Sequence, residues 1–194
     1  MTRASQAERI QESLKEAALV KLKLAEEALP ILDDLSRVWT RALVRGGKIV
    51  LFGNGGSAAD AQHIAAELEG RYERERRPWP VLALTTNASA LTAIGNDYGF
   101  DDVFERLVRA YVRKGDVAVG LSTSGNSRNV IAGLKAAKRL GAVTVAFTGR
   151  GGGKVAKIAD HVFRAPSDHT PRIQECHITA GHILCEMVEL ALPK

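Results

Sequence analysis

The sequence predicts an α/β protein: a three-layer, doubly wound parallel sheet of five strands, preceded by an N-terminal helical pair. Short apolar runs rich in Val, Leu and Ile alternate with longer helical stretches, which is the pattern of a parallel sheet covered on both faces. Polar loops rich in Gly, Ser, Thr and Asn follow four of the runs. The 194 residues suit one compact domain, which we expect to span residues 1–194.

Residues 4–45 have the apolar spacing of amphipathic helices. Pro30 should end or kink the first piece, so two helices are expected. This pair, residues 1–45, is longer than a small sheet needs to cover itself. We therefore expect it to pack against a partner subunit; the alternative is that it lies along its own domain.

After Gly46 and Gly47 the spacing becomes that of strands. The expected strands are residues 48–53, 80–86, 116–123, 143–149 and 161–166. The expected helices are residues 57–72, 88–112, 127–140, 152–159 and 171–191. Because ligands bind beyond the carboxyl ends of parallel strands, the loops that follow the strands should hold the functional site.

Composition excludes several classes of protein. Hydrophobic residues make up 45% and charged residues 25%, as in a globular protein. No apolar run approaches the roughly 20 residues that span a bilayer, and the N-terminus lacks a signal peptide's apolar segment. We therefore expect a cytoplasmic protein without a membrane partner. The net charge of +5 is spread among acidic residues without a nucleic-acid-binding motif, and it suits an anionic substrate.

The two cysteines predict no disulfide. Cys176 and Cys185 are nine residues apart in one expected helix, which puts them on opposite faces. We expect both to be reduced core residues, in keeping with a reducing compartment.

Two loops resemble known phosphate-binding patterns. Residues 53–58 match the dinucleotide-binding glycine pattern, but residues 85–87 at the end of the next strand lack the acid that would hold the ribose. Residues 148–155 fit a nucleotide P-loop poorly, since Thr148 replaces its first glycine and Val155 its magnesium-binding hydroxyl. A dinucleotide site and a P-loop are therefore the weaker interpretations.

The segment "STSGNS" favours a phosphate monoester site. It offers four hydroxyls between a strand and a helix, those of Ser122, Thr123, Ser124 and Ser127. Hydroxyls, free backbone N–H groups and the positive end of a helix dipole together bind such an anion. The alternative is helix capping, for which a single serine near residue 127 suffices.

Two helices carry residues suited to acid–base or metal chemistry. His63 and Glu67 lie four residues apart and share one face of their helix. The last helix carries a second polar cluster of Gln174, Glu175, His177, His182 and Glu186. Periodicity does not select among these five: Glu175 and His182 share a face best, and Gln174 lies about 80° from His182.

These motifs together resemble one family. From residue 48 to residue 190 the segments "GNGGSAADAQHIAAEL", "ALTTNASALTAIGNDYG", "STSGNS", "FTG" and "RIQECHITAGHILCEMVE" resemble the sugar isomerase (SIS) domain proteins, and within them the isomerases of sedoheptulose 7-phosphate. The resemblance implies a flavodoxin-like SIS fold. It also implies conversion of sedoheptulose 7-phosphate to D-glycero-D-manno-heptose 7-phosphate through an enediol(ate), the first step of nucleotide-activated heptose biosynthesis for glycans such as lipopolysaccharide.

The resemblance also implies the site residues, and each expected residue type is present here. One zinc ion per subunit would be held by His63, Glu67, Gln174 and His182, with Glu67 as base and His182 as acid. The phosphate would be held by Ser122, Thr123, Ser124 and Ser127. The sugar would contact Asn54, Gly55, Gly56, Ser57, Glu67, Asn96, Asp97 and Gln174. The family is homotetrameric, with active sites shared between subunits. One relative has an acid where this chain has Pro171, so that contact is missing here.

Other members of the same family suggest alternative functions. A non-catalytic adaptor that binds the bacterial replication initiator has a similar fold, but the motifs that it lacks, including Glu67 and His182, are intact here. A sugar-phosphate-sensing regulator needs a DNA-binding domain, and no helix-turn-helix is visible. An amino-sugar or etherase enzyme more often carries two such domains. We therefore expect an isomerase.

Overall fold

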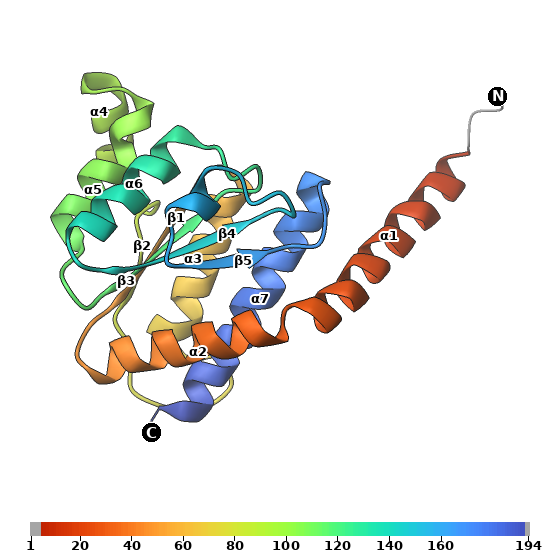
Figure 1. Ribbon diagram of the computed structural model, residues 1–194, viewed down its shortest axis with the longest axis horizontal. Helices are drawn as coiled ribbons and strands as arrows, with labels where there is room; N and C mark the ends of the chain where they lie inside the picture. Colours follow the sequence, from red (N-terminus) through yellow and green to blue (C-terminus); the bar gives the residue numbers. More distant parts are fainter. Residues whose placement is uncertain (1–4, 193–194) are drawn as a thin grey trace.

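The computed structural model describes residues 5–192 and has three layers, as expected (Figure 1). Its central sheet has five parallel strands in the order β2-β1-β3-β4-β5. The strands are β1 (Ile49–Gly53), β2 (Val81–Ala83), β3 (Val117–Leu121), β4 (Val143–Thr148) and β5 (His161–Arg164). The predicted fold class is therefore confirmed.

Helices cover both faces of the sheet. They are α1 (Gln6–Glu27), α2 (Leu29–Val44), α3 (Gly56–Glu69), α4 (Ala88–Asp97), α5 (Val103–Tyr111), α6 (Arg128–Arg139) and α7 (Thr170–Ala191). Alternate residues of β1 face opposite sides, so that Leu51 packs with α2, α3 and α7 whereas Phe52 packs with α5 and α6. All five residues of β1 are buried, which explains its unbroken apolar sequence.

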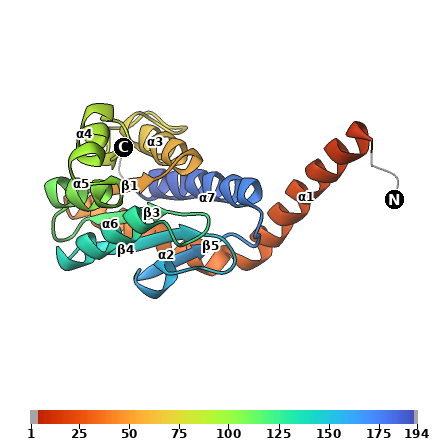
Figure 2. The same ribbon diagram turned by 90° about the horizontal axis from the view of Figure 1, so that it is seen from above.

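The N-terminal pair is two helices, because Pro30 lies in the first turn of α2, where a missing N–H costs nothing. Helix α1 begins with a capping box formed by Ser5 and Glu8. It contacts α7 but extends away from the sheet, as the perpendicular views show (Figures 1 and 2). Four large apolar side chains along it are more than half exposed: Ile10, Leu14, Leu19 and Leu22.

Two expected helices differ from the structure. The stretch 88–112 is broken into α4, the 3-10 turn η1 (Phe100–Asp102) and α5, because Gly99 has a φ of +99° that no helix contains. The stretch 152–159 forms only the 3-10 turn η2 (Val155–Lys157), since Gly152 and Gly153 also have positive φ. The expected strand 80–86 is likewise shorter, because residues 84–86 already turn away from the sheet.

Both cysteines are free and buried on α7, so the predicted absence of a disulfide is confirmed. Burial raises the pKa of both thiols, that of Cys185 to about 12. They are therefore core residues rather than reactive thiols.

Within the described residues, no helix combines the length and the apolar character that crossing a membrane requires.

Candidate active site

Helices α3 and α7 pack side by side and bring together three of the predicted residues. His63 Nε2 lies 2.9 Å from His182 Nε2 and 3.2 Å from Glu67 Oε1. One donor atom from each of the three side chains lies within 4.8 Å of the others. Residues 119 positions apart in the sequence thus form one cluster.

A close approach of the two helices makes this cluster possible. Gly181 precedes His182, and a Cβ atom at Gly181 would lie only 2.5 Å from Ile64 Cδ1. Ile64 in turn follows His63 and is fully buried. The missing side chain therefore lets α7 approach α3 at the level of the two histidines.

The donor set fits a zinc ion. Two imidazole nitrogens and one carboxylate oxygen are ligands that zinc prefers. Cys185 lies nearby on α7, but burial first and then the charge of Glu67 raise the pKa of its thiol to about 12. Its sulfur is not among the donor atoms that lie within 4.8 Å of one another, so the donor set is His63, Glu67 and His182.

Gln174 lies elsewhere on α7. Eight residues separate it from His182, which corresponds to about 12 Å along the helix. Its amide instead covers the start of α3, where a Cβ atom at Gly56 would lie 2.1 Å from Gln174 Nε2. Within one chain, Gln174 therefore belongs to the glycine loop rather than to the histidine cluster.

The glycine loop connects β1 to α3 at the carboxyl edge of the sheet. Gly55 has φ +56° and ψ −121°, a backbone conformation that requires glycine. Ser57 is buried in the first turn of α3. The Asn54 side chain exchanges two hydrogen bonds of 2.9 Å with Asn129, one in each direction. Sequence reasoning missed Asn129, although a polar residue on the apolar face of α6 was a signal for it.

The serine loop, residues 122–127, gathers hydroxyls at the start of α6. Ser122 Oγ and Ser127 Oγ are 2.9 Å apart, and Ser124 Oγ accepts a hydrogen bond from the Asn126 N–H. Ser127 precedes the helix, but its hydroxyl makes no capping bond. Helix capping therefore does not account for this loop, and its hydroxyls are available for an anion.

Asn96 and Asp97 end α4 and precede η1, which packs against α6. Both are exposed, and the Asn96 amide donates a 2.8 Å hydrogen bond to the Asp97 carboxylate. Helix α4 packs against η1 and α5, on the other face of the sheet from α7 (Figure 1). Among residues 5–192, no hydrogen bond or ion pair connects this pair to His63, Glu67 or His182.

Two further groups near the cluster were not predicted. Glu189 accepts hydrogen bonds from the backbone N–H groups of residues 72–74 and pairs with Arg76. Burial raises the pKa of Glu189, but these bonds and the Arg76 charge outweigh it and lower the pKa overall. The network fixes Tyr72, whose ring centroid is 6.1 Å from that of His182. In the sequence, Glu189 was signalled only by being an acid on the buried side of an apolar helix.

Asp60 is the second such group and lies one turn before His63 on α3. Burial raises its pKa to about 6, although the charge of His63 acts in the opposite direction. Its Oδ2 atom is buried without a hydrogen-bond partner among the described residues. This carboxyl therefore takes up a proton at a higher pH than an exposed aspartate does.

A cluster of two histidines and a carboxylate between α3 and α7, together with a hydroxyl-lined loop at the carboxyl edge of a doubly wound sheet, suits an enzyme that acts on a phosphorylated substrate. Residues 14–149 match the SIS domain family, and the chain belongs to this family.

Two curated relatives are phosphoheptose isomerases. That of Aquifex aeolicus is 59% identical over 182 residues, 94% of this chain and 95% of the relative. That of Rhodospirillum rubrum is 55% identical over 166 residues, 86% of this chain and 88% of the relative.

Solved structures agree with these relatives. The phosphoheptose isomerase of Neisseria gonorrhoeae superposes with a TM-score of 0.91 at 43% identity, covering 96% of this chain and 100% of the other. A phosphoheptose isomerase of Francisella tularensis gives a TM-score of 0.94 at 31% identity, with the same coverage. The likeness extends over almost the whole of this chain, including α1 and α7.

Proposed function

We propose that this chain is an aldose–ketose isomerase that converts sedoheptulose 7-phosphate to D-glycero-D-manno-heptose 7-phosphate. The observation that carries the proposal is the cluster of His63, Glu67 and His182 in a chain 59% identical to a phosphoheptose isomerase. The named relatives are isomerases, which gives no support to the alternative of a non-catalytic adaptor for the replication initiator. The reaction would be the first step of nucleotide-activated heptose biosynthesis, in the cytoplasm.

The reaction moves one proton between neighbouring carbons. The Glu67 carboxylate is the base that takes the proton from C1 and returns it to C2, by way of an enediol(ate). His182 is the acid that gives a proton to the oxygen on C2, and it is restored when it takes the proton of the hydroxyl on C1. His63, 2.9 Å from His182, orients its ring. Glu67 is 23% exposed, so its carboxylate is both sheltered and accessible to a substrate.

We propose one zinc ion per subunit, held by His63, Glu67 and His182. When bound, the ion would polarise the substrate carbonyl as a Lewis acid. Gln174 is the proposed fourth ligand. Since one chain places it two turns of α7 from His182, this role depends on a site completed by a neighbouring subunit.

We place the substrate between the two loops at the carboxyl edge of the sheet. The phosphate is held by Ser122, Thr123, Ser124 and Ser127, at the positive end of the α6 dipole. The sugar contacts Asn54, Gly55, Gly56, Ser57, Glu67, Asn96, Asp97 and Gln174. Since Glu67 lies eleven residues, about 16 Å, along α3 from Gly56, one chain does not bring the base and the loops together, which favours a site shared between subunits.

We propose a homotetramer in which residues 1–45 pack between subunits. The support is the row of exposed apolar side chains on α1, of which Leu14 is 67% and Leu22 64% exposed. Light scattering should give a tetramer for the wild type and a smaller species for Leu14→Glu/Leu22→Glu. Lys15→Glu/Lys23→Glu, which changes only charged residues of α1, is the control and should remain tetrameric. A monomeric wild type would contradict this assembly.

The central experiment measures turnover directly. Purified protein is incubated with sedoheptulose 7-phosphate, and heptose 7-phosphate is followed by NMR. Glu67→Gln keeps the shape of the side chain but removes the base, so kcat should fall by about 10²–10⁴-fold. The control Glu69→Gln changes an exposed acid of the same helix and should keep wild-type turnover. Absence of product with the wild type, or a fully active Glu67→Gln, would overturn the proposal.

A further inference from the structure

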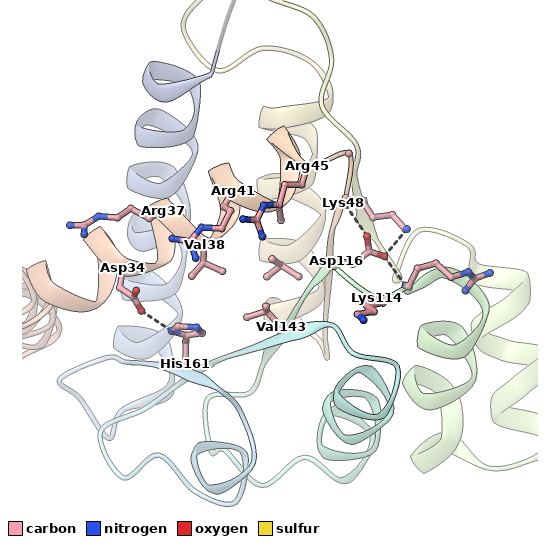
Figure 3. A pocket seen from close by; sticks show the side chains of 16 residues that line it. Asp34, Arg37, Val38, Arg41, Arg45, Lys48, Lys114, Asp116, Val143 and His161 are labelled. Carbon is pink, nitrogen blue, oxygen red and sulfur yellow. Dashed lines mark hydrogen bonds and ion pairs between the residues drawn. The ribbon is translucent and has the colours of Figure 1, made fainter.

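A second pocket lies at the opposite edge of the sheet, where the strands begin. Its volume is about 600 Å³, and it lies between α2 and the amino ends of β1, β3, β4 and β5 (Figure 3). Strand β1 runs from this edge at Ile49 to the glycine loop after Gly53, a length of about 16 Å. No residue of its lining belongs to the glycine loop, the serine loop or the cluster of His63, Glu67 and His182, so within one chain the pocket is separate from the proposed active site.

The pocket holds most of the net charge of the protein. Two carboxylates, Asp34 and Asp116, face six cations that line it: Arg37, Arg41, Arg45, Lys48, Arg113 and Lys114. The lining thus has an excess of four positive charges, compared with an excess of five for the whole chain. A concentration of charge around a concave surface raises the local concentration of anions.

Neither Asp34 nor Asp116 pairs with the side chains of Arg41, Arg45 or Lys114 in the pocket. Asp116 is 3% exposed and accepts hydrogen bonds from the backbone N–H groups of Lys48 and Arg113 and from the Lys48 ammonium. Asp34 pairs with His161 at 2.7 Å. Across residues 5–192, the side chains of Arg41, Arg45 and Lys114 make no hydrogen bond or ion pair, although each lines the pocket.

The geometry presents these cations to one ligand. Arg37 and Arg41 lie one turn apart on α2 and Arg45 caps its C-terminus, so the three share one side of the helix, although the Arg37 guanidinium pairs with Asp33. Opposite them, Lys114 reaches the pocket from the loop before β3 (Figure 3). The apolar side chains of the lining are small: Val38, Ala42, Val117 and Val143. No Phe, Tyr or Trp of the described residues lines the pocket.

We propose that this pocket binds a small molecule with two or more linked phosphate groups. Three unpaired cations around one pocket match several negative charges better than one, and arginine binds phosphate oxygens in pairs. The volume lies within the range of small-molecule sites. Among residues 5–192, no Phe, Tyr or Trp lines the pocket, and its one imidazole, that of His161, is held by Asp34, so a nucleobase gains little from stacking and recognition rests on the phosphates. The shared chemistry is a pyrophosphate group, either inorganic or part of a nucleotide.

Isothermal titration calorimetry with the full chain tests the proposal, using inorganic pyrophosphate and ADP as probes. Wild type should bind both, with dissociation constants within about fivefold of each other. Arg41→Gln/Arg45→Gln should weaken pyrophosphate binding about tenfold or more, since each arginine supplies charge-assisted hydrogen bonds. The control Arg109→Gln/Lys135→Gln removes the same charge from exposed sites outside the pocket and should bind within about twofold of wild type.

A third variant distinguishes pyrophosphate binding in the pocket from pyrophosphate binding at the serine loop. Thr123→Val/Ser124→Ala should lower isomerase turnover but leave pyrophosphate binding unchanged, whereas Arg41→Gln/Arg45→Gln should keep both its unfolding temperature and its turnover. Three results would overturn the proposal: no binding by wild type, equal losses in the two charge-removal variants, or loss of binding in the serine-loop variant. Selective binding of ADP over pyrophosphate would contradict recognition through phosphates alone.

Discussion

Arg76 Nε lies 3.0 Å from Glu189 Oε1, and each of the two side chains is only 3% exposed. The pair connects the last turns of α7 to the segment that follows α3. Arg76 also donates 2.8 and 2.9 Å hydrogen bonds to the carbonyls of Glu67 and Leu68. The buried pair therefore fixes the end of the helix that carries the proposed base.

Removing one partner of this pair should be costly. Glu189→Gln leaves the guanidinium of Arg76 buried without its counter-charge, and we expect a loss of about 3–5 kcal/mol in the free energy of unfolding. Urea denaturation measures this loss. Glu73→Gln, an exposed acid of the same segment, is the control and should stay within about 0.5 kcal/mol of wild type. Equal stability of Glu189→Gln and wild type would mean that the pair does not hold this segment.

Gly56 should matter for activity more than for stability. A methyl group in Gly56→Ala would overlap Gln174 Nε2, but that amide ends a flexible side chain and can move away. We therefore expect near-normal unfolding temperature and a clear fall in kcat/KM, because Gln174 is a proposed substrate and metal contact. Gly151→Ala is a matched control, since a Cβ atom there meets nothing within 4 Å and φ is not positive. Normal kcat/KM in Gly56→Ala would remove Gln174 from the site.

Metal binding can be measured apart from turnover. After dialysis against zinc, we expect one ion per wild-type chain and a higher unfolding temperature, because a ligand at 100 times its Kd stabilises by about 2.7 kcal/mol. His182→Asn should bind little zinc, whereas His169→Asn, which changes an exposed histidine, should bind as wild type does. Unchanged turnover of metal-stripped enzyme would exclude zinc from the mechanism.

The sequence was sufficient for the fold because two inner strands of the sheet, β1 and β3, are continuous apolar runs that are fully buried. Helix ends were less predictable. The break at Gly99 depends on a backbone conformation that the apolar spacing of residues 88–112 does not reveal. Periodicity likewise gives no reason to expect η2 in place of a helix.

The site was predictable only in part for a related reason. His63 and Glu67 share a face through local spacing, but their meeting with His182 requires the long-range packing of Gly181 on Ile64. Asn129 and Glu189 were missed because their partners are distant in sequence and include backbone groups. Local patterns specify which residues can react; tertiary packing decides which of them meet.

Acid should weaken the fold through His177. This residue is fully buried between Phe147 and Phe163, and its Nε2 lies 3.2 Å from the Thr148 carbonyl oxygen. Burial lowers its pKa to about 4 from the ordinary 6.5, against the opposing effect of that hydrogen bond. Between these two values the unfolded chain binds a proton that the folded chain does not, so stability falls as pH falls.

The expected loss from this histidine is about 2 kcal/mol between pH 7.5 and pH 5. His177→Gln should be less stable than wild type at pH 7.5, but its stability should fall less steeply toward pH 5, by that amount. Urea denaturation at both pH values gives the slope independently of the starting stability. Arg109→Gln changes an exposed side chain that does not titrate in this pH range and should keep the wild-type slope. The His177→Gln substitution removes only the titration of His177. If the free energy of unfolding of His177→Gln fell between pH 7.5 and pH 5 as much as that of wild type, other groups would be responsible for the acid sensitivity.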